Sequence, residues 1–102
     1  MKLLGLYHIA LLPTSDEDAF VSHMADAPDP QLTRVTSSVT HQLLKRPDGL
    51  RRYAWQLNVE SMTGAYDFDG NLEPLQDHIK DFGVVFGVDT YAEVARDRSV
   101  GG

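Results

Sequence analysis

The sequence predicts one α+β domain in which two helices cover one face of a four-stranded antiparallel sheet. Three observations lead to this class. Four segments have the apolar patterns of strands, two have apolar residues at helical spacing, and turn residues separate them. In chain order the segments are strand, helix, strand, strand, helix and strand, and a length of 102 residues leaves room for one core only.

The first strand and helix follow from residues 2–25. Apolar side chains occupy both alternating positions of residues 2–12, which is typical of a strand covered on both sides, and Pro13 ends it. The run Thr14-Ser15-Asp16-Glu17 matches a capping box, so a helix is expected to begin there. The apolar positions of this helix are Phe20, Met24 and Ala27.

The second and third strands form a predicted hairpin. Pro47-Asp48-Gly49 has the chemistry of a three-residue hairpin loop, because Pro presets φ and Gly accepts a left-handed backbone. A loop of this length pairs Arg46 with Leu50 and therefore places His41 directly opposite Trp55.

The strand before this loop is expected to begin near residue 33, where apolar and polar residues start to alternate. A second helix is expected over residues 72–82, whose apolar residues step by three and four. Asn71 is placed to cap this helix and Gly83 to end it.

The alternation over residues 84–94 predicts the last strand, with Phe86 on its inward-facing side. We expect a single domain over residues 1–95 and a flexible C-terminal tail over residues 96–102.

Composition excludes several classes of partner. Nine Lys and Arg against fifteen Asp and Glu give a net charge of −6, which disfavours nucleic acid and anionic membrane surfaces. No apolar run is long enough to span a bilayer, so no membrane partner is expected. The absence of Cys excludes disulfides, thiolate metal sites and a Cys nucleophile, and it fits a cytoplasmic location.

The element order βαββαβ is the ferredoxin-like, or split βαβ, arrangement. The predicted second face of the sheet mixes polar and apolar residues, which favours pairing with a second copy, sheet to sheet. In element order and length over residues 2–94, the chain resembles the dimeric α+β barrel superfamily. That superfamily includes quinone-forming monooxygenases, polyketide cyclases, lactone isomerases and stress-response barrels. The resemblance implies a homodimer that binds a flat aromatic or polyketide-derived molecule between helices and sheet and needs no cofactor.

His41 and Trp55 are the most informative candidate pair. The predicted register makes them cross-strand neighbours on the helix-covered face, with Tyr53 and Phe86 nearby. One interpretation is a general acid or base, His41, held against aromatic walls that stack a planar substrate. The other is a half-buried histidine packed on tryptophan at the edge of the sheet.

His8, in the predicted central strand, is the next candidate for substrate binding. The structural alternative is a core histidine bonded to a backbone carbonyl. A metal site would need further ligands; Glu60 is conceivable, but the chain has no close-spaced ligand pair, so no metal is expected. The run Asp67 to Asn71 resembles part of a calcium loop but lacks the first and twelfth ligands, and a turn with a helix cap explains it.

The leading functional hypothesis is therefore a small cofactor-independent enzyme, of the monooxygenase, cyclase or isomerase class. It would act by proton transfer on a hydrophobic cyclic, aromatic or polyketide-type molecule in a pocket between helices and sheet. The alternative is a noncatalytic small-molecule-binding or stress-associated dimer with the same pocket. A third hypothesis is a structural assembly module whose aromatic face is filled core.

Overall fold

A computed structural model describes residues 1–25 and 39–94 of the chain. Its elements are β1 (Lys2–Leu11), α1 (Glu17–Ala25), β2 (Val39–Lys45), β3 (Arg52–Glu60), the 3-10 turn η2 (Asp69–Asn71), α2 (Leu72–Ile79) and β4 (Gly83–Ala92). The predicted helix position Ala27, the predicted start of the second strand at residues 33–38 and the predicted tail lie outside the described residues. No helix in the described part of the chain has the length and apolar character needed to cross a membrane.

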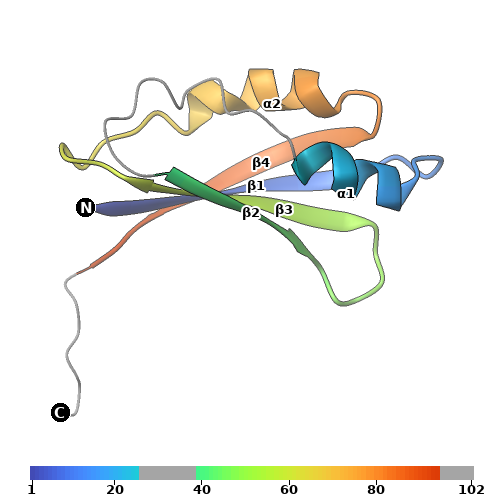
Figure 1. Ribbon diagram of the computed structural model, residues 1–102, viewed down its shortest axis with the longest axis horizontal. Helices are drawn as coiled ribbons and strands as arrows, with labels where there is room; N and C mark the ends of the chain where they lie inside the picture. The colour runs from blue at the N-terminus through green and yellow to red at the C-terminus, as the bar shows by residue number, and fades with distance from the viewer. Residues whose placement is uncertain (26–38, 95–102) are drawn as a thin grey trace, which may run out of the picture.

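The four strands form one antiparallel sheet in the order β2-β3-β1-β4. β1 lies between β3 and β4, and both helices lie on the same side of the sheet (Figure 1). The predicted α+β class, with a four-stranded antiparallel sheet and two helices, is therefore confirmed. The arrangement is compatible with a ferredoxin-like type of fold.

The core lies between the sheet and the two helices. Along β1 and β3, buried side chains alternate with partly exposed ones, as the period of two in a strand requires. The sheet contributes to the core Leu3, Tyr7, Ile9, Leu11, Tyr53, Trp55, Leu57 and Val59, and the helices contribute Phe20, Met24, Leu75 and Ile79. We refer to this side of the sheet as the covered face.

The other side of the sheet, the open face, carries neither α1 nor α2 (Figure 1). The strand pairing assigns to it Leu4, Leu6, His8, Ala10, Ala54, Gln56, Asn58, Phe86, Asp89 and Tyr91. Polar and apolar groups are mixed there, and Phe86 and Tyr91 are more than half exposed.

The β2–β3 hairpin differs from its predicted register. His41 pairs with Leu57 and not with Trp55, which is a shift of two residues. Because side chains alternate with a period of two, this shift leaves every side chain on its predicted face, and His41 remains a diagonal neighbour of Trp55.

The cause of the shift is the loop. Arg46 is the last residue before the loop to bond across the hairpin, through its N–H to the carbonyl of Arg52 at 3.1 Å, so the loop is longer than expected. Inside the loop Asp48 Oδ1 accepts from the N–H of Leu50 at 3.0 Å, and Gly49 takes a φ of 80°. The left-handed glycine was predicted, but the side-chain turn at Asp48 extends the connection.

Helix α1 begins at Glu17, and its cap is Asp16. Asp16 Oδ1 accepts from the N–H groups of Asp18 at 2.9 Å and Ala19 at 3.2 Å. The predicted capping box at Thr14 is therefore wrong, because the helix begins later than expected and Asp16 is the residue directly before it.

The predicted cap of α2 is also wrong. Asn71 has helical backbone angles and makes no capping hydrogen bond. It is 1% exposed, and its Nδ2 donates to the hydroxyls of Tyr7 and Tyr66, both at 3.0 Å. The Tyr7 hydroxyl in turn donates to the carbonyl of Phe68 at 2.8 Å. Asn71 therefore ties the segment before α2 to the central strand.

Strand β4 contains a bulge opposite the junction of His8 and Ile9. His8 pairs with Gly87 and Ile9 pairs with Val85, so Phe86 is the extra residue. The side chain of Phe86 lies on the open face, where it is 55% exposed. The expectation that Phe86 faces inward is wrong, because a bulge changes the alternation that a regular strand would follow.

Gly83 is the first residue of β4 and does not end the helix, which finishes at Ile79. A Cβ on Gly83 would clash with the backbone oxygen of Ala10 and lie 3.0 Å from Cα of Leu11. The side-chain-free residue is needed here for close approach of β4 to β1.

We predict that Gly83→Ala destabilises the fold by about 1–3 kcal/mol, the usual cost of overpacking against atoms that cannot move aside. Urea denaturation followed by circular dichroism measures the change. Gly87→Ala in the same strand is the matched control, since a Cβ there meets no atom within 4 Å. Equal losses in the two variants would contradict the role of close approach.

Candidate functional site

The predicted site residues occupy two different sides of the sheet. Tyr53 and Trp55 belong to the covered face, where the ring of His41 lies beside Trp55. His8 and Phe86 belong to the open face, where both line one depression. The structure therefore divides the expected single site into two groups.

The rings of His41 and Trp55 are 5.7 Å apart, centre to centre, and inclined by 46°. His41 is exposed, whereas Trp55 is 1% exposed and also packs on Tyr7, with ring centres 5.6 Å apart. A planar substrate could therefore stack on Trp55 only after displacing core side chains. The catalytic role of His41 stays a prediction.

Tyr53 is occupied by a structural contact. Its hydroxyl donates to Glu17 Oε2 at 2.7 Å, and Lys45 Nζ lies 3.0 Å from the same oxygen. Burial, together with this hydrogen bond, raises the pKa of Tyr53 to about 12. The hydrogen bond from Tyr53, and then that from Lys45, lower the pKa of Glu17. Tyr53 is thus a protonated donor that fastens β3 to α1.

His8 has a different partner from the one expected. Its Nε2 lies 2.8 Å from Asp89 Oδ2, on the neighbouring strand β4. The alternative of a core histidine bonded to a backbone carbonyl is therefore wrong. Strand pairing explains the contact: His8 is opposite Gly87, and Asp89, two residues further along β4, projects from the same face.

Phe86 and Asp89 lie on either side of Gly87, the residue of β4 that pairs with His8. The ring centre of Phe86 is 5.8 Å from that of His8. The Cζ atom of Arg52 lies 5.5 Å from the same Phe86 ring centre. These residues come from three strands, since β1 supplies His8, β3 supplies Arg52 and β4 supplies Phe86. The sequence placed Asp89 on the uncovered side but gave no sign that it would meet His8.

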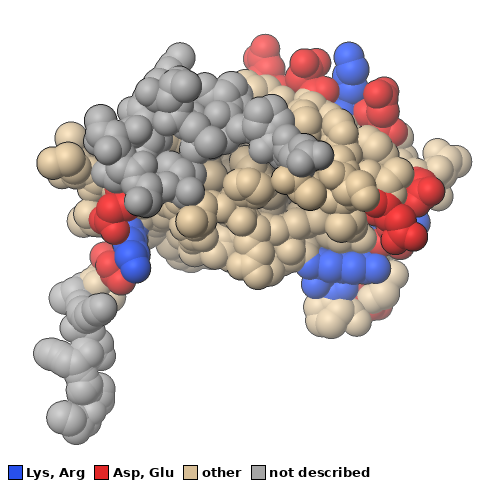
Figure 2. Space-filling model, viewed as in Figure 1, with Lys and Arg blue, Asp and Glu red and all other residues tan. Residues whose placement is uncertain are grey.

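A depression of about 350 Å³ opens beside these groups, and we call it the His8 depression. Its lining consists of His8, Leu44, Lys45, Arg46, Pro47, Arg52, Tyr53, Ala54 and Phe86. Figure 2 shows Lys and Arg side chains gathered near the tip of the β2–β3 hairpin, in contrast to the Asp and Glu side chains along α2. A basic rim beside a histidine and an exposed ring distinguishes this end of the sheet.

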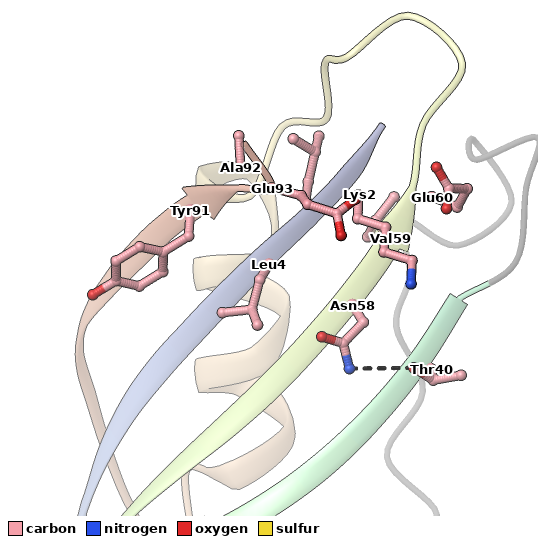
Figure 3. A pocket seen from close by; sticks show the side chains of 10 residues that line it. Lys2, Leu4, Thr40, Asn58, Val59, Glu60, Tyr91, Ala92 and Glu93 are labelled. Atoms are coloured by element: carbon pink, nitrogen blue, oxygen red, sulfur yellow. Dashed lines mark hydrogen bonds between the residues drawn. The ribbon is translucent and has the colours of Figure 1, made fainter. Parts of the chain in front are cut away.

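The opposite end of the open face carries a second depression of about 590 Å³ (Figure 3). Leu4, Asn58 and Tyr91 contribute to its lining, and Asn58 Nδ2 donates to Thr40 Oγ1 at 3.2 Å. Gln56 Nε2 donates to Asn58 Oδ1 at 3.0 Å. Thr40 and Asn58 therefore already have hydrogen-bond partners in this lining, which also carries the charged residues Lys2, Glu60 and Glu93.

Two further histidines lie between the helices. The rings of His23 on α1 and His78 on α2 stack with centres 4.1 Å apart, and a nitrogen of His23 lies 2.7 Å from the carbonyl oxygen of His78. Nε2 of His78 is buried and has no hydrogen-bond partner within residues 1–25 and 39–94. Burial, and then the neighbouring His23, lower the pKa of His78. Within the described ranges, no group of three His, Cys, Asp or Glu side chains could hold a metal ion.

We predict that the fold loses stability as pH falls below about 6.5, the ordinary value for histidine, because His78 binds a proton more readily in the unfolded chain. His78→Phe keeps an aromatic ring without a titratable nitrogen and should reduce this loss. Urea denaturation at several pH values between 7.5 and 5 measures it, with exposed His41→Phe as the control. An unchanged pH dependence in His78→Phe would contradict the assignment.

No protein-family model, no curated protein and no solved structure matches this chain.

Proposed function

We propose that this chain is a small cofactor-independent enzyme that transfers a proton on a hydrophobic cyclic or aromatic molecule bound at its open face. The observation that carries the proposal is the 2.8 Å contact between His8 Nε2 and Asp89 Oδ2 at the wall of the His8 depression. This site differs from the pocket between helices and sheet that the sequence suggested, and the proposed reaction is the same.

The pair has the chemistry of an oriented general base. When neutral His8 donates from Nε2 to the Asp89 carboxylate, its Nδ1 is an acceptor and can remove a proton. Asp89 then stabilises the imidazolium that forms, and it fixes the orientation of the ring. Phe86 supplies an exposed aromatic surface next to the base, suited to a planar ring.

The proposed step moves one proton and no other atom. The C–H bond next to a ring carbonyl breaks, its electron pair becomes an enolate, and the proton binds His8 Nδ1. His8 returns the proton to the same or another atom of the substrate. Removal of a proton is a first step that isomerases, cyclases and cofactor-free monooxygenases share, so the site chemistry supports the group of classes as a whole.

The proposal includes an architecture, a ferredoxin-like fold that dimerises through its open face into an α+β barrel. Four strands of seven to ten residues, about 4.8 Å apart and rising about 3.3 Å per residue, give a face on the order of 600 Å². Side chains that project from the sheet increase this area, which brings it close to the roughly 800 Å² that each partner buries in a standard interface. A second copy would cover Leu4 and Tyr91.

The proposal also places the protein in the cytoplasm, a location that a cysteine-free composition fits.

A second candidate site is the original one at His41 and Trp55. The observation in its favour is that Trp55 Nε1 is buried without a hydrogen-bond partner among the described residues, so an acceptor atom of a ligand beside it would satisfy a buried donor. In this alternative the protein binds a small molecule against Trp55, with or without chemistry at His41.

The first test is proton exchange on a cyclic ketone. We predict that the protein accelerates deuterium incorporation into 2-tetralone in D2O, followed by proton NMR, and that His8→Ala removes about 10²-fold or more of the acceleration. His41→Ala is the matched control, since this histidine lies outside the His8 depression.

The result has three readable outcomes. Loss of exchange in His8→Ala with retention in His41→Ala supports the proposed site. The reverse pattern supports the second candidate and overturns the first. Exchange at the uncatalysed rate with the unaltered protein overturns the enzyme proposal and leaves the noncatalytic binder.

The second test concerns assembly. We predict a dimer in sedimentation equilibrium, and Leu4→Lys, which places a charge on the open face, should convert it to a folded monomer. Leu50→Lys at the hairpin tip, a leucine that is 52% exposed, serves as control and should leave the dimer intact. A monomeric unaltered protein would contradict the proposed barrel.

A further inference from the structure

The His8 depression contains a cation, Arg52, that has no anionic partner in the part of the chain that the structure describes. No carboxylate among the residues that the structure describes pairs with Arg52, although Arg52 is exposed and lines the depression. The neighbouring cations differ in this respect. Lys45 lies 3.0 Å from Glu17, and Arg46 lies 2.8 Å from Asp48.

An unpaired guanidinium is notable in a chain whose net charge is −6, because fifteen acidic residues are available to pair with nine basic ones. Arg52 lies instead against an aromatic ring, with its Cζ 5.5 Å from the centre of Phe86. This contact orients the planar group and leaves its N–H donors for another partner. A guanidinium held in this way fits the two oxygens of a carboxylate.

The surroundings favour a ring attached to that carboxylate. Leu44, Ala54 and the exposed ring of Phe86 give the depression an apolar wall. A volume of about 350 Å³ is at the small end of the range of about 300–1,000 Å³ found for ligand sites, which suits a molecule of one or two rings.

Charge also selects among anions. One free guanidinium neutralises the single charge of a carboxylate, whereas a phosphate monoester carries about −1.5 to −2 at neutral pH and would need a second free cation. The two other cations in the lining already have carboxylate partners, so a carboxylate is the better match.

We propose that the His8 depression binds a planar aromatic carboxylate, whose carboxylate pairs with Arg52 and whose ring packs on Phe86 next to His8. This inference rests on the proposed function in placing the substrate beside the His8–Asp89 pair, and it adds the substrate class. Arg52 is a binding residue here and takes no part in proton transfer.

The experiment compares 1-naphthoate with 1-naphthamide, which have similar size and differ in charge, by isothermal titration calorimetry. The unaltered protein should bind naphthoate about 10-fold or more tightly than naphthamide. Arg52→Gln should bring the two affinities to within about twofold of each other. Lys80→Gln, with the same change in net charge at an exposed residue outside the depression, should keep the preference.

Equal effects of Arg52→Gln and Lys80→Gln would mean general electrostatic attraction and would overturn the proposal. Absence of any preference for naphthoate, or absence of binding by either compound, would overturn it as well. Selective naphthoate binding without proton exchange on 2-tetralone would uphold the carboxylate site while the enzyme proposal fails, so the two failures are distinguishable.

Discussion

The structure depends on β1 being hydrogen-bonded on both edges, to β3 and to β4, along nearly its whole length. A strand held on both edges cannot rotate, so each side chain is fixed on one of the two faces. Tyr7 and Ile9 are completely buried under the helices, and between them His8 projects to the other side. The same alternation that builds the core therefore delivers an imidazole to the open face.

The covered face is closed by contacts that leave little for a ligand. Glu17 accepts a hydrogen bond from Tyr53 and forms an ion pair with Lys45. The hydroxyl of Tyr7 accepts from the amide of Asn71 and donates to the carbonyl of Phe68. These bonds give partners to the hydroxyls of Tyr7 and Tyr53 and to the amide nitrogen of Asn71, as buried polar groups require. The open face differs, because His8, Arg52 and Phe86 combine charge and apolar surface on the side of the sheet away from α1 and α2.

Local sequence signals predicted the element order, the four-stranded sheet and most of the core, because apolar periodicity records burial directly. They did not predict details set by tertiary contact. The hairpin register differs from the prediction because Asp48 forms a turn with Leu50. The prediction that Gly83 ends a helix is wrong because a glycine is needed there for the close approach of Ala10, which belongs to a strand distant in sequence. The contact between His8 and Asp89 was missed for the same reason, since pairing of β1 with β4 creates it.

The bulge in β4 has one more consequence. Val85 and Gly87, on either side of Phe86, keep regular partners in β1, so the ladder would close without the inserted residue. The aromatic wall is thus an addition to a complete sheet. Substitution or deletion of Phe86 could therefore adapt the depression to a different ligand while the sheet keeps its architecture.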